Sequence, residues 1–214
     1  MVSDNYKLQF ITHSNEKYTC VDSARMALDG GCKWIQFRMK NAEKSVFEQG
    51  ALKVQQLCKD YGATFIVNDD VMLAKQIMAD GVHLGKEDMS LVEAKEILGS
   101  GFIIGRTVND FEDVRSTITD AAPDYFGCGP FRFTSTKKNL APILGHAGYK
   151  DILSKMRLSG VNIPLVAIGG ICKADIKELL HDGVDGIALS GSILNATDPA
   201  REMRETARII YAAT

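Results

Sequence analysis

The sequence lacks the features that mark several classes of protein. No run approaches the roughly 20 consecutive apolar residues of a transmembrane helix. The first ten residues, MVSDNYKLQF, do not show the basic and then apolar pattern of a signal peptide. Positive charge is not in surplus, because 25 Lys and Arg stand against 27 Asp and Glu, for a net charge of -2. We therefore expect a cytoplasmic protein with no membrane partner and no nucleic-acid partner bound through a basic face.

Cysteine and histidine are too few and too scattered for the common metal or disulfide patterns. The chain has five Cys and four His, with no CxxC, HxH or HExxH spacing. This argues against a zinc site or a disulfide framework, and the Cys residues are expected to be buried thiols. His83 lies inside an apolar run and is expected to be a packing residue; only His13 falls at the end of a predicted strand. There is also no GxSxG motif for a nucleophilic serine.

Eight short apolar runs recur along the chain, and amphipathic segments separate them. The runs are LQFIT, WIQFRM, TFIVND, VHLG, FIIGRT, YFGCGPF, PLVAIGG and GIALSG, beginning at residues 8, 34, 64, 82, 102, 125, 164 and 186. Two of the intervening segments have helical periodicity. In the segment 47–62, Phe47, Leu52, Val54 and Leu57 are predicted to share one face, and in 91–101 the inward residues are Leu91, Ala94, Ile97 and Leu98.

Regular alternation of strand and helix predicts a parallel sheet with helical crossovers. Eight units in 214 residues leave about 27 residues each, near the minimum for a (β/α)8 barrel. No linker or low-complexity stretch divides the chain, so residues 1–214 are predicted to form a single TIM-barrel domain of the α/β class. In such barrels the chemistry lies at the carboxyl ends of the strands.

Charged and amide side chains follow the second and third predicted strands. Gln36, Arg38 and Lys40 alternate, so they can point the same way, and an Arg with a Lys suits phosphate oxygens. A solvated strand end would give the same pattern. The third strand ends in Asn68, Asp69 and Asp70, and Asp88 follows the fourth. A carboxylate pair suits Mg²⁺, but each Asp could instead cap a helix; Asp70 is the better cap and Asp69 the better ligand.

The last three strands are followed by segments suited to anions. The segment Thr134, Ser135, Thr136 and Lys137 combines hydroxyls with a cation, although a polar surface loop would look the same. Gly169–Gly170 and Ser190–Gly191–Ser192 follow the seventh and eighth strands, where barrels commonly hold a phosphate. Two anion sites without an evident base or nucleophile between them suggest departure of pyrophosphate and its replacement by a second phosphorylated substrate.

These motifs together resemble those of the thiamine phosphate synthase family. WIQFRMK, FIVNDD, ADGVHLGKEDM, GPFRFTSTKK, VAIGGI and DGIALSGSI occur in the family's order and spacing, from about residue 8 to residue 193. The resemblance implies a TIM barrel that joins a hydroxymethylpyrimidine diphosphate to a thiazole phosphate, with Mg²⁺, to give thiamine phosphate and pyrophosphate. The implied reaction is dissociative, and the family leaves room for a homo-oligomer.

The resemblance also implies roles for individual residues. The expected pyrimidine diphosphate contacts are Gln36, Arg38, Lys40 and Asn68; the Mg²⁺ ligands Asp69 and Asp88; the pyrophosphate contacts Thr107 and Lys137; and the thiazole phosphate contacts Thr134, Ser135, Thr136, Gly170, Ser190 and Gly191. Of these, Arg38, Lys40 and Lys137 are expected to be catalytic, because they would stabilise the charge on the leaving group.

The chain departs from the family pattern at several positions. Asp70 replaces a usual Arg, Lys86 a usual Gln, and Arg106 a small apolar residue; FTSTK replaces PTxTK, and Ser190–Gly191 an apolar residue followed by Ser. We expect Arg106 either to add charge near the pyrophosphate or to obstruct the pyrimidine.

Three other functions remain compatible with this fold. A related thiazole tautomerase would need an acid–base His where Pro130 stands. A non-catalytic barrel could bind thiamine precursors without converting them. An unrelated sugar-phosphate isomerase would explain the phosphate site but not the QxRxK and ND motifs.

Overall fold

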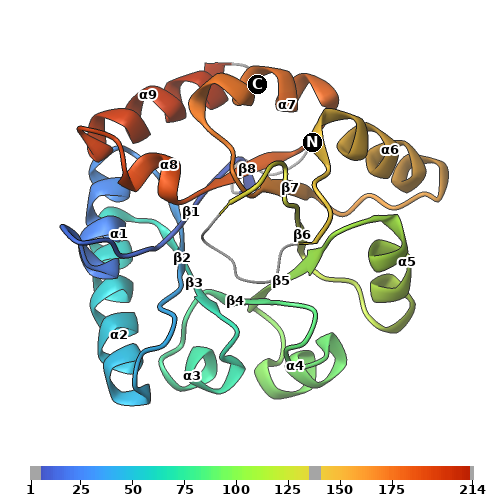
Figure 1. Cartoon of the computed structure of the whole chain (residues 1–214). Coiled ribbons are helices and arrows are strands. Elements are labelled where there is room, and N and C mark those ends of the chain that lie inside the picture. The colour runs from blue at the N-terminus through green and yellow to red at the C-terminus, as the bar shows by residue number, and fades with distance from the viewer. Residues whose placement is uncertain (1–5, 135–140, 213–214) are drawn as a thin grey trace.

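The computed structural model describes residues 6–134 and 141–212, which form a closed barrel of eight parallel strands surrounded by helices (Figure 1). The strands are β1 (Leu8–Ile11), β2 (Trp34–Phe37), β3 (Thr64–Asn68), β4 (Gly81–Leu84), β5 (Ile103–Val108), β6 (Tyr125–Cys128), β7 (Leu165–Ile168) and β8 (Gly186–Leu189). The helices are α1 (Cys20–Asp29), α2 (Lys44–Tyr61), α3 (Val71–Gln76), α4 (Leu91–Leu98), α5 (Phe111–Asp120), α6 (Gly145–Leu158), α7 (Ile176–Asp182), α8 (Gly191–Leu194) and α9 (Pro199–Ala212). All eight predicted strands and the barrel topology are confirmed.

Each strand pairs with its sequence neighbour, and β1 pairs with β8 to close the sheet. Two strands begin at glycines because neighbouring backbone passes close to them. A Cβ on Gly81 would lie 2.0 Å from the carbonyl oxygen of Ile103, and one on Gly186 would lie 1.8 Å from that of Tyr6. A side chain at either position would separate the strands at the start of the barrel.

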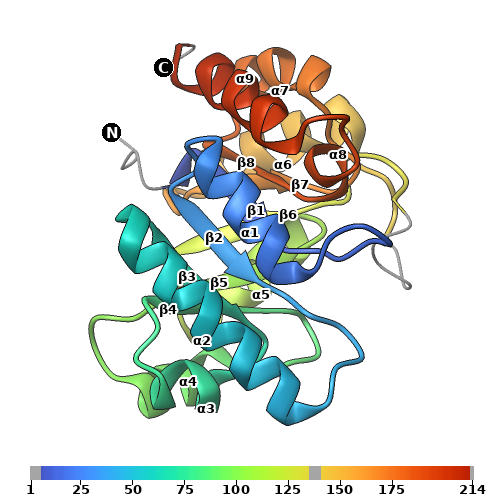
Figure 2. The ribbon, with the colours of Figure 1, turned by 90° about the vertical axis from the view of Figure 1, so that its left-hand side faces the viewer.

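Apolar side chains form two cores, one on each face of the barrel sheet. The larger core lies between the strands and the helices, and Phe10, Ile35, Phe37, Phe65 and Phe126 are fully buried in it. The smaller core fills the barrel interior with Ile11, Trp34, Ile66, Tyr125, Val166 and Ala188. Figure 2 shows α1 and α2 packed on the outer face of the first strands. Because a strand points alternate residues to opposite faces, a sheet covered on both faces reads as a continuous apolar run.

The helix α2 departs from the predicted pattern in one respect. Its buried residues are Gly50, Ala51, Val54, Leu57 and Cys58, whereas Leu52 is 50% exposed. The prediction that Leu52 faces the core is therefore wrong. Residues 47, 51, 54 and 58 follow the helical repeat, and position 52 lies about 200° around the helix from position 54. In α4, Leu91, Ala94 and Leu98 are buried and Gly99 ends the helix, as predicted.

Within the part of the chain that the structure describes, no helix is long and apolar enough to cross a membrane.

Candidate functional site

A cavity of about 680 Å³ opens at the carboxyl ends of the strands. It brings together residues from every part of the chain that the sequence singled out. Eleven predicted site residues line it: Gln36, Arg38, Lys40, Asn68, Asp69, Asp88, Thr107, Thr134, Gly170, Ser190 and Gly191. The other three, Ser135, Thr136 and Lys137, lie outside the described residues. The predicted clustering at the barrel mouth is therefore observed for every predicted residue that the structure describes.

The end of β2 is held in a defined position by side chains from β1 and from Thr12, the residue after it. Thr12 accepts a hydrogen bond from the backbone N–H of Arg38 at 2.8 Å, and its hydroxyl donates to the carbonyl of the same residue at 2.9 Å. The buried amide of Gln36 donates to Gln9 at 3.3 Å. Partial burial lowers the pKa of Arg38, and nearby Asp69 acts in the opposite direction. Arg38 thus presents a partly desolvated positive charge to the cavity, where electrostatic interactions are stronger than in water.

Asp69 and Asp88 form a close carboxylate pair on the neighbouring strand ends. The pKa of Asp69 rises to about 7, first because the protein displaces water from it and then because it hydrogen-bonds to and is repelled by Asp88. Asp69 also has a backbone φ of 68°, in the left-handed region that only a few per cent of non-glycine residues adopt. Such strain is concentrated at functional sites.

Neither of these two carboxylates caps a helix. Asp70 caps α3, since its side chain accepts from the N–H of Leu73 at 2.8 Å, as predicted. Ser90 caps α4, while Asp88 accepts from the N–H of Gly85 at 2.6 Å and so folds its own loop back on itself. The helix-cap alternative is thus excluded for Asp69 and Asp88.

The donor set at this point suits a hard divalent cation. Among the described residues, no three His, Cys, Asp or Glu side chains gather around one point. These residues therefore do not surround a metal with protein ligands alone. A carboxylate pair leaves coordination positions for water and substrate oxygens, which is the ligand set that Mg²⁺ prefers. Two adjacent carboxylates that repel each other also gain the most from a cation between them.

His83 is a cavity residue that the sequence analysis assigned to packing. It is only 7% exposed, yet it lines the cavity floor. Its Nδ1 lies 3.0 Å from the hydroxyl of Tyr125 and its Nε2 lies 2.9 Å from that of Thr107. Tyr125 in turn accepts from Gln9 at 3.2 Å. A neutral His83 can satisfy both contacts by accepting at one nitrogen and donating at the other.

Two glycines inside strands make room for this floor. A Cβ on Gly105 would lie 2.2 Å from the Tyr125 ring and 2.5 Å from Nδ1 of His83. A Cβ on Gly127 would lie 2.8 Å from Cε1 of His83. Glycine in a strand interior often marks a close approach. The glycines of FIIGRT and YFGC were thus the available signal for a bulky polar residue in the barrel.

The opposite side of the cavity is built from the loops after β6, β7 and β8. Gly169 and Gly170 have φ values of 96° and 69°, and a Cβ on Gly170 would lie 2.5 Å from Cγ of Arg132. Arg132 donates to the Gly170 carbonyl at 3.0 Å and pairs with Asp175, so it joins two of these loops. The Ser190 hydroxyl is buried without a hydrogen-bond partner in the described part of the chain. This hydroxyl is therefore available to form a hydrogen bond with a ligand in the cavity.

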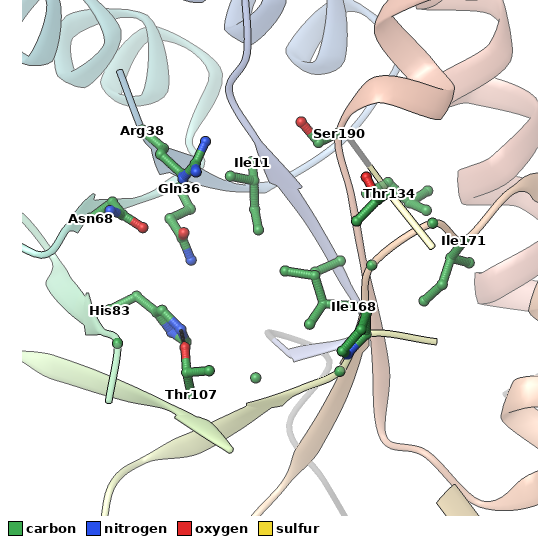
Figure 3. A pocket seen from close by; sticks show the side chains of 18 of the residues that line it. Ile11, Gln36, Arg38, Asn68, His83, Thr107, Thr134, Ile168, Ile171 and Ser190 are labelled. Atoms are coloured by element: carbon green, nitrogen blue, oxygen red, sulfur yellow. Dashed lines mark hydrogen bonds between the residues drawn. The ribbon is translucent and has the colours of Figure 1, made fainter. Parts of the chain in front are cut away.

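The cavity therefore has two polar sides with an apolar middle (Figure 3). Gln36, Arg38, Asn68, His83 and Thr107 lie together on one side, while Ser190 and Thr134 lie on the other. Ile11 and Ile168 extend between them.

Arg106 does not contribute to the cavity, which corrects both expectations for it. It is adjacent to Thr107 on β5, so its side chain leaves the opposite face of the strand, outside the barrel. Its guanidinium donates to the carbonyls of Met89 and Lys86 at 3.2 Å each.

Comparison with known proteins identifies the family of this chain. Residues 8–193 match the family model described as thiamine monophosphate synthase. A thiamine-phosphate synthase of Phocaeicola vulgatus is 53% identical over 95% of this chain and 98% of its own, and one of Flavobacterium johnsoniae is 45% identical over 96% and 97%. The solved structure of a thiamine phosphate pyrophosphorylase from Pyrococcus furiosus, 36% identical, covers 98% of each chain with a TM-score of 0.84. On this extent of match, the chain belongs to the thiamine monophosphate synthase family.

Proposed function

We propose that this protein is a thiamine-phosphate synthase, a transferase that joins a pyrimidine methyl diphosphate to a thiazole phosphate and releases pyrophosphate. The observation that carries the proposal is the two-sided cavity. It has a cation and a carboxylate pair on one side and a glycine and serine cradle on the other. In a chain of this family, that arrangement accommodates one diphosphate and one monophosphate.

The pyrimidine diphosphate is assigned to the side formed by β2 to β5. Arg38 and Lys40 would bind the diphosphate, because a guanidinium fork and an ammonium complement phosphate oxygens. Asn68 and Gln36 offer donors and acceptors to the ring nitrogens and the amino group. The Thr107 hydroxyl, which His83 orients, is assigned to the diphosphate. Lys137 is assigned to the same diphosphate on the family motif alone.

Asp69 and Asp88 are assigned to Mg²⁺. The metal, when bound, would neutralise the diphosphate and stabilise the charge that grows on it as it leaves. Its ligands would be these two carboxylates together with substrate oxygens and water. The hydrogen bond from Gly85 orients Asp88 for this role.

The thiazole phosphate is assigned to the side formed by the loops after β6, β7 and β8. Gly170 lets the phosphate approach the backbone, and the buried Ser190 hydroxyl would gain the partner that it lacks. Gly191 opens α8, where backbone N–H groups are available to an anion. Thr134, Ser135 and Thr136 complete the assignment by motif.

The proposed chemistry is a dissociative substitution. The bond between the pyrimidine methylene carbon and the diphosphate oxygen breaks, and the bonding pair stays with pyrophosphate. The thiazole nitrogen then donates its lone pair to the methylene cation, so no external base is needed. Arg38 and Lys40 would stabilise the departing oxygens. The apolar side chains of Ile11 and Ile168, between the two halves, would keep water from capturing the cation.

The competing tautomerase function finds no support in the cavity. Its acid–base histidine would stand at Pro130, which lines the cavity and has no ionisable group. His83 is engaged with Tyr125 and Thr107 at the floor.

The decisive experiment is a synthase assay with purified protein, both phosphorylated substrates and Mg²⁺, reading out thiamine phosphate. We expect product that disappears with EDTA and falls at least about 100-fold in Asp69→Asn, the scale of one preorganised electrostatic contact. Asp151→Asn, an exposed residue paired with Lys155 on α6, is the control and should keep full activity. Binding of both substrates without product would instead favour a precursor-binding protein and overturn the proposal.

A further inference from the structure

The loop that carries Asp88 is held from outside the barrel by Arg106. The loop runs from Gly85 to Ser90, between β4 and α4. One guanidinium nitrogen of Arg106 donates to the carbonyl of Lys86, and the other donates to the carbonyl of Met89. These carbonyls lie on either side of Asp88 in the sequence. A single planar group therefore fastens both sides of the turn that holds the carboxylate.

The same loop has a second attachment. Nζ of Lys86 lies 2.7 and 2.8 Å from the two carboxylate oxygens of Asp113 on α5. Asp113 also accepts from the N–H of Asn109 at 2.8 Å. Lys86 and Arg106 are two of the positions at which this chain departs from the family pattern, and both contribute to this attachment. Together they tie the loop after β4 to β5 and to the start of α5.

We propose that Arg106 is a positioning residue that holds Asp88 in place for metal binding, although it touches neither the metal nor the substrates. This inference rests on the proposed function, in which Asp69 and Asp88 hold the metal. The internal hydrogen bond from Gly85 fixes the Asp88 side chain relative to its own loop. Arg106 fixes the loop relative to β5, so the pair Asp69 and Asp88 keeps its spacing. Groups that orient metal ligands in this way strongly affect metal affinity.

A positioning role for Arg106 and a purely electrostatic role predict opposite effects of its removal on cation binding, which makes the inference testable. If Arg106 acted only as a nearby positive charge, its removal would tighten cation binding. If it positions Asp88, removal weakens binding. We expect Arg106→Ala to weaken Mn²⁺ binding by about 10-fold, the lower end of the loss of affinity seen when a group that orients a metal ligand is removed. Electron paramagnetic resonance of Mn²⁺ without substrates measures this binding. Arg106→Lys, which keeps the charge but has no fork, should recover part of this loss.

Hydrogen exchange of the intact protein provides a readout that does not depend on metal. Amides of residues 85–90 should exchange faster in Arg106→Ala than in the wild type, with the remaining barrel amides unchanged. Arg201→Ala, which breaks an exposed pair with Glu205 on α9, is the matched control and should alter neither measurement. The Mg²⁺ concentration for half-maximal synthase activity should rise with the Mn²⁺ dissociation constant.

Unchanged or tighter Mn²⁺ binding by Arg106→Ala would overturn the inference. Unchanged loop exchange would overturn the attachment itself. A wild-type protein that binds no Mn²⁺ either alone or with pyrophosphate present would reject the metal assignment of Asp69 and Asp88, and with it the positioning role, while faster loop exchange would still identify the attachment. Failure of the positioning role and failure of the metal assignment therefore give different results.

Discussion

At the scale of single residues, side chains that are adjacent in the sequence have different roles. Asp69 turns into the cavity with a left-handed backbone and meets Asp88, while Asp70 turns back to cap α3. Thr107 faces the cavity and Arg106 faces away from it, because adjacent strand residues point to opposite faces. One position along the chain thus separates a cavity group from a structural one.

Arg38 supplies a prediction at this scale. We expect Arg38→Ala to lower kcat/KM at least about 100-fold, because a partly buried guanidinium stabilises charge that develops on the leaving diphosphate. Arg38→Lys should recover only part, since it keeps the charge without the planar fork. Steady-state kinetics with both substrates measure this, and unchanged kinetics for the Ala variant would reject the assignment.

Gly105 supplies a second prediction. The Cβ of Gly105→Ala would enter the Tyr125 ring and the His83 imidazole, so the floor of the cavity must shift. We expect a loss of about 1–3 kcal/mol in the free energy of unfolding, the usual cost of overpacking. Gly148→Ala on α6 is the control. Its Cβ would lie 2.9 Å from Cβ of Leu144, a milder overlap than at Gly105, and Ala favours a helix by up to about 1 kcal/mol. Urea unfolding should show a clearly larger loss in the free energy of unfolding for Gly105→Ala than for Gly148→Ala, and equal changes would contradict the prediction.

At the scale of elements, caps determine where the short helices begin and thereby which strand-end residues remain in the cavity. The α3 helix has six residues and relies on Asp70 at its N-terminus. The α4 helix begins at a capping box in which Ser90 and Glu93 bond reciprocally. These caps leave Asp69 and Asp88 in the preceding loops, at the barrel mouth.

The cap of α3 gives a prediction that separates the two adjacent aspartates. Asp70→Ala should cost about 1 kcal/mol in the free energy of unfolding, because the N–H of Leu73 loses its acceptor. Asp70→Ser should retain most of that stability. Denaturant unfolding of these variants beside Asp69→Asn is the measurement. Equal stability of Asp70→Ala and the wild type would show that the cap contributes nothing.

At the scale of the whole molecule, the outer layer is joined by ion pairs between helices that follow different strands. Asp182 at the end of α7 accepts from His146 and pairs with Nζ of Lys150 at 3.0 Å, both on α6. Its side chain is fully buried. Burial alone would raise its pKa, but hydrogen bonds from His146 and Lys150 outweigh this effect, and the net pKa is lowered.

The lowered pKa of Asp182 predicts that the protein loses stability in acid. A carboxyl whose folded-state pKa is lowered stabilises the fold above its unfolded pKa of about 3.9, and that contribution is lost as the pH falls through the lower folded value. Asp182→Asn should therefore lower the free energy of unfolding at pH 7 by on the order of 2 kcal/mol, the scale of lost hydrogen bonds to charged groups, and lower the Tm with it. It should narrow the difference in Tm between pH 7 and pH 3. An unchanged difference would contradict this role for Asp182.

The barrel and the position of its site were largely predictable from the sequence, because both depend on short-range patterns. Eight β-branched runs at regular spacing predict parallel strands, and polar residues at their ends predict where the mouth lies. Gln36, Asn68 and Ser190 lie far apart in the chain, yet all three line the cavity at the barrel mouth, where the sequence placed them. Leu52 was wrongly assigned because apolar content alone does not set the angle around a helix.

Only the tertiary structure decided which side chains meet. His83 reads as an apolar-strand residue until the strand register sets it beside Gly105 and near Tyr125. Arg106 reads as a cavity charge until the structure places its neighbour Thr107 in the cavity and Arg106 itself beside the loop of Asp88. The fold follows from periodicities that each segment carries by itself. The site depends on distances between segments up to about 180 residues apart, from Ile11 to Ser190, which no local pattern encodes and which packing of the closed sheet determines.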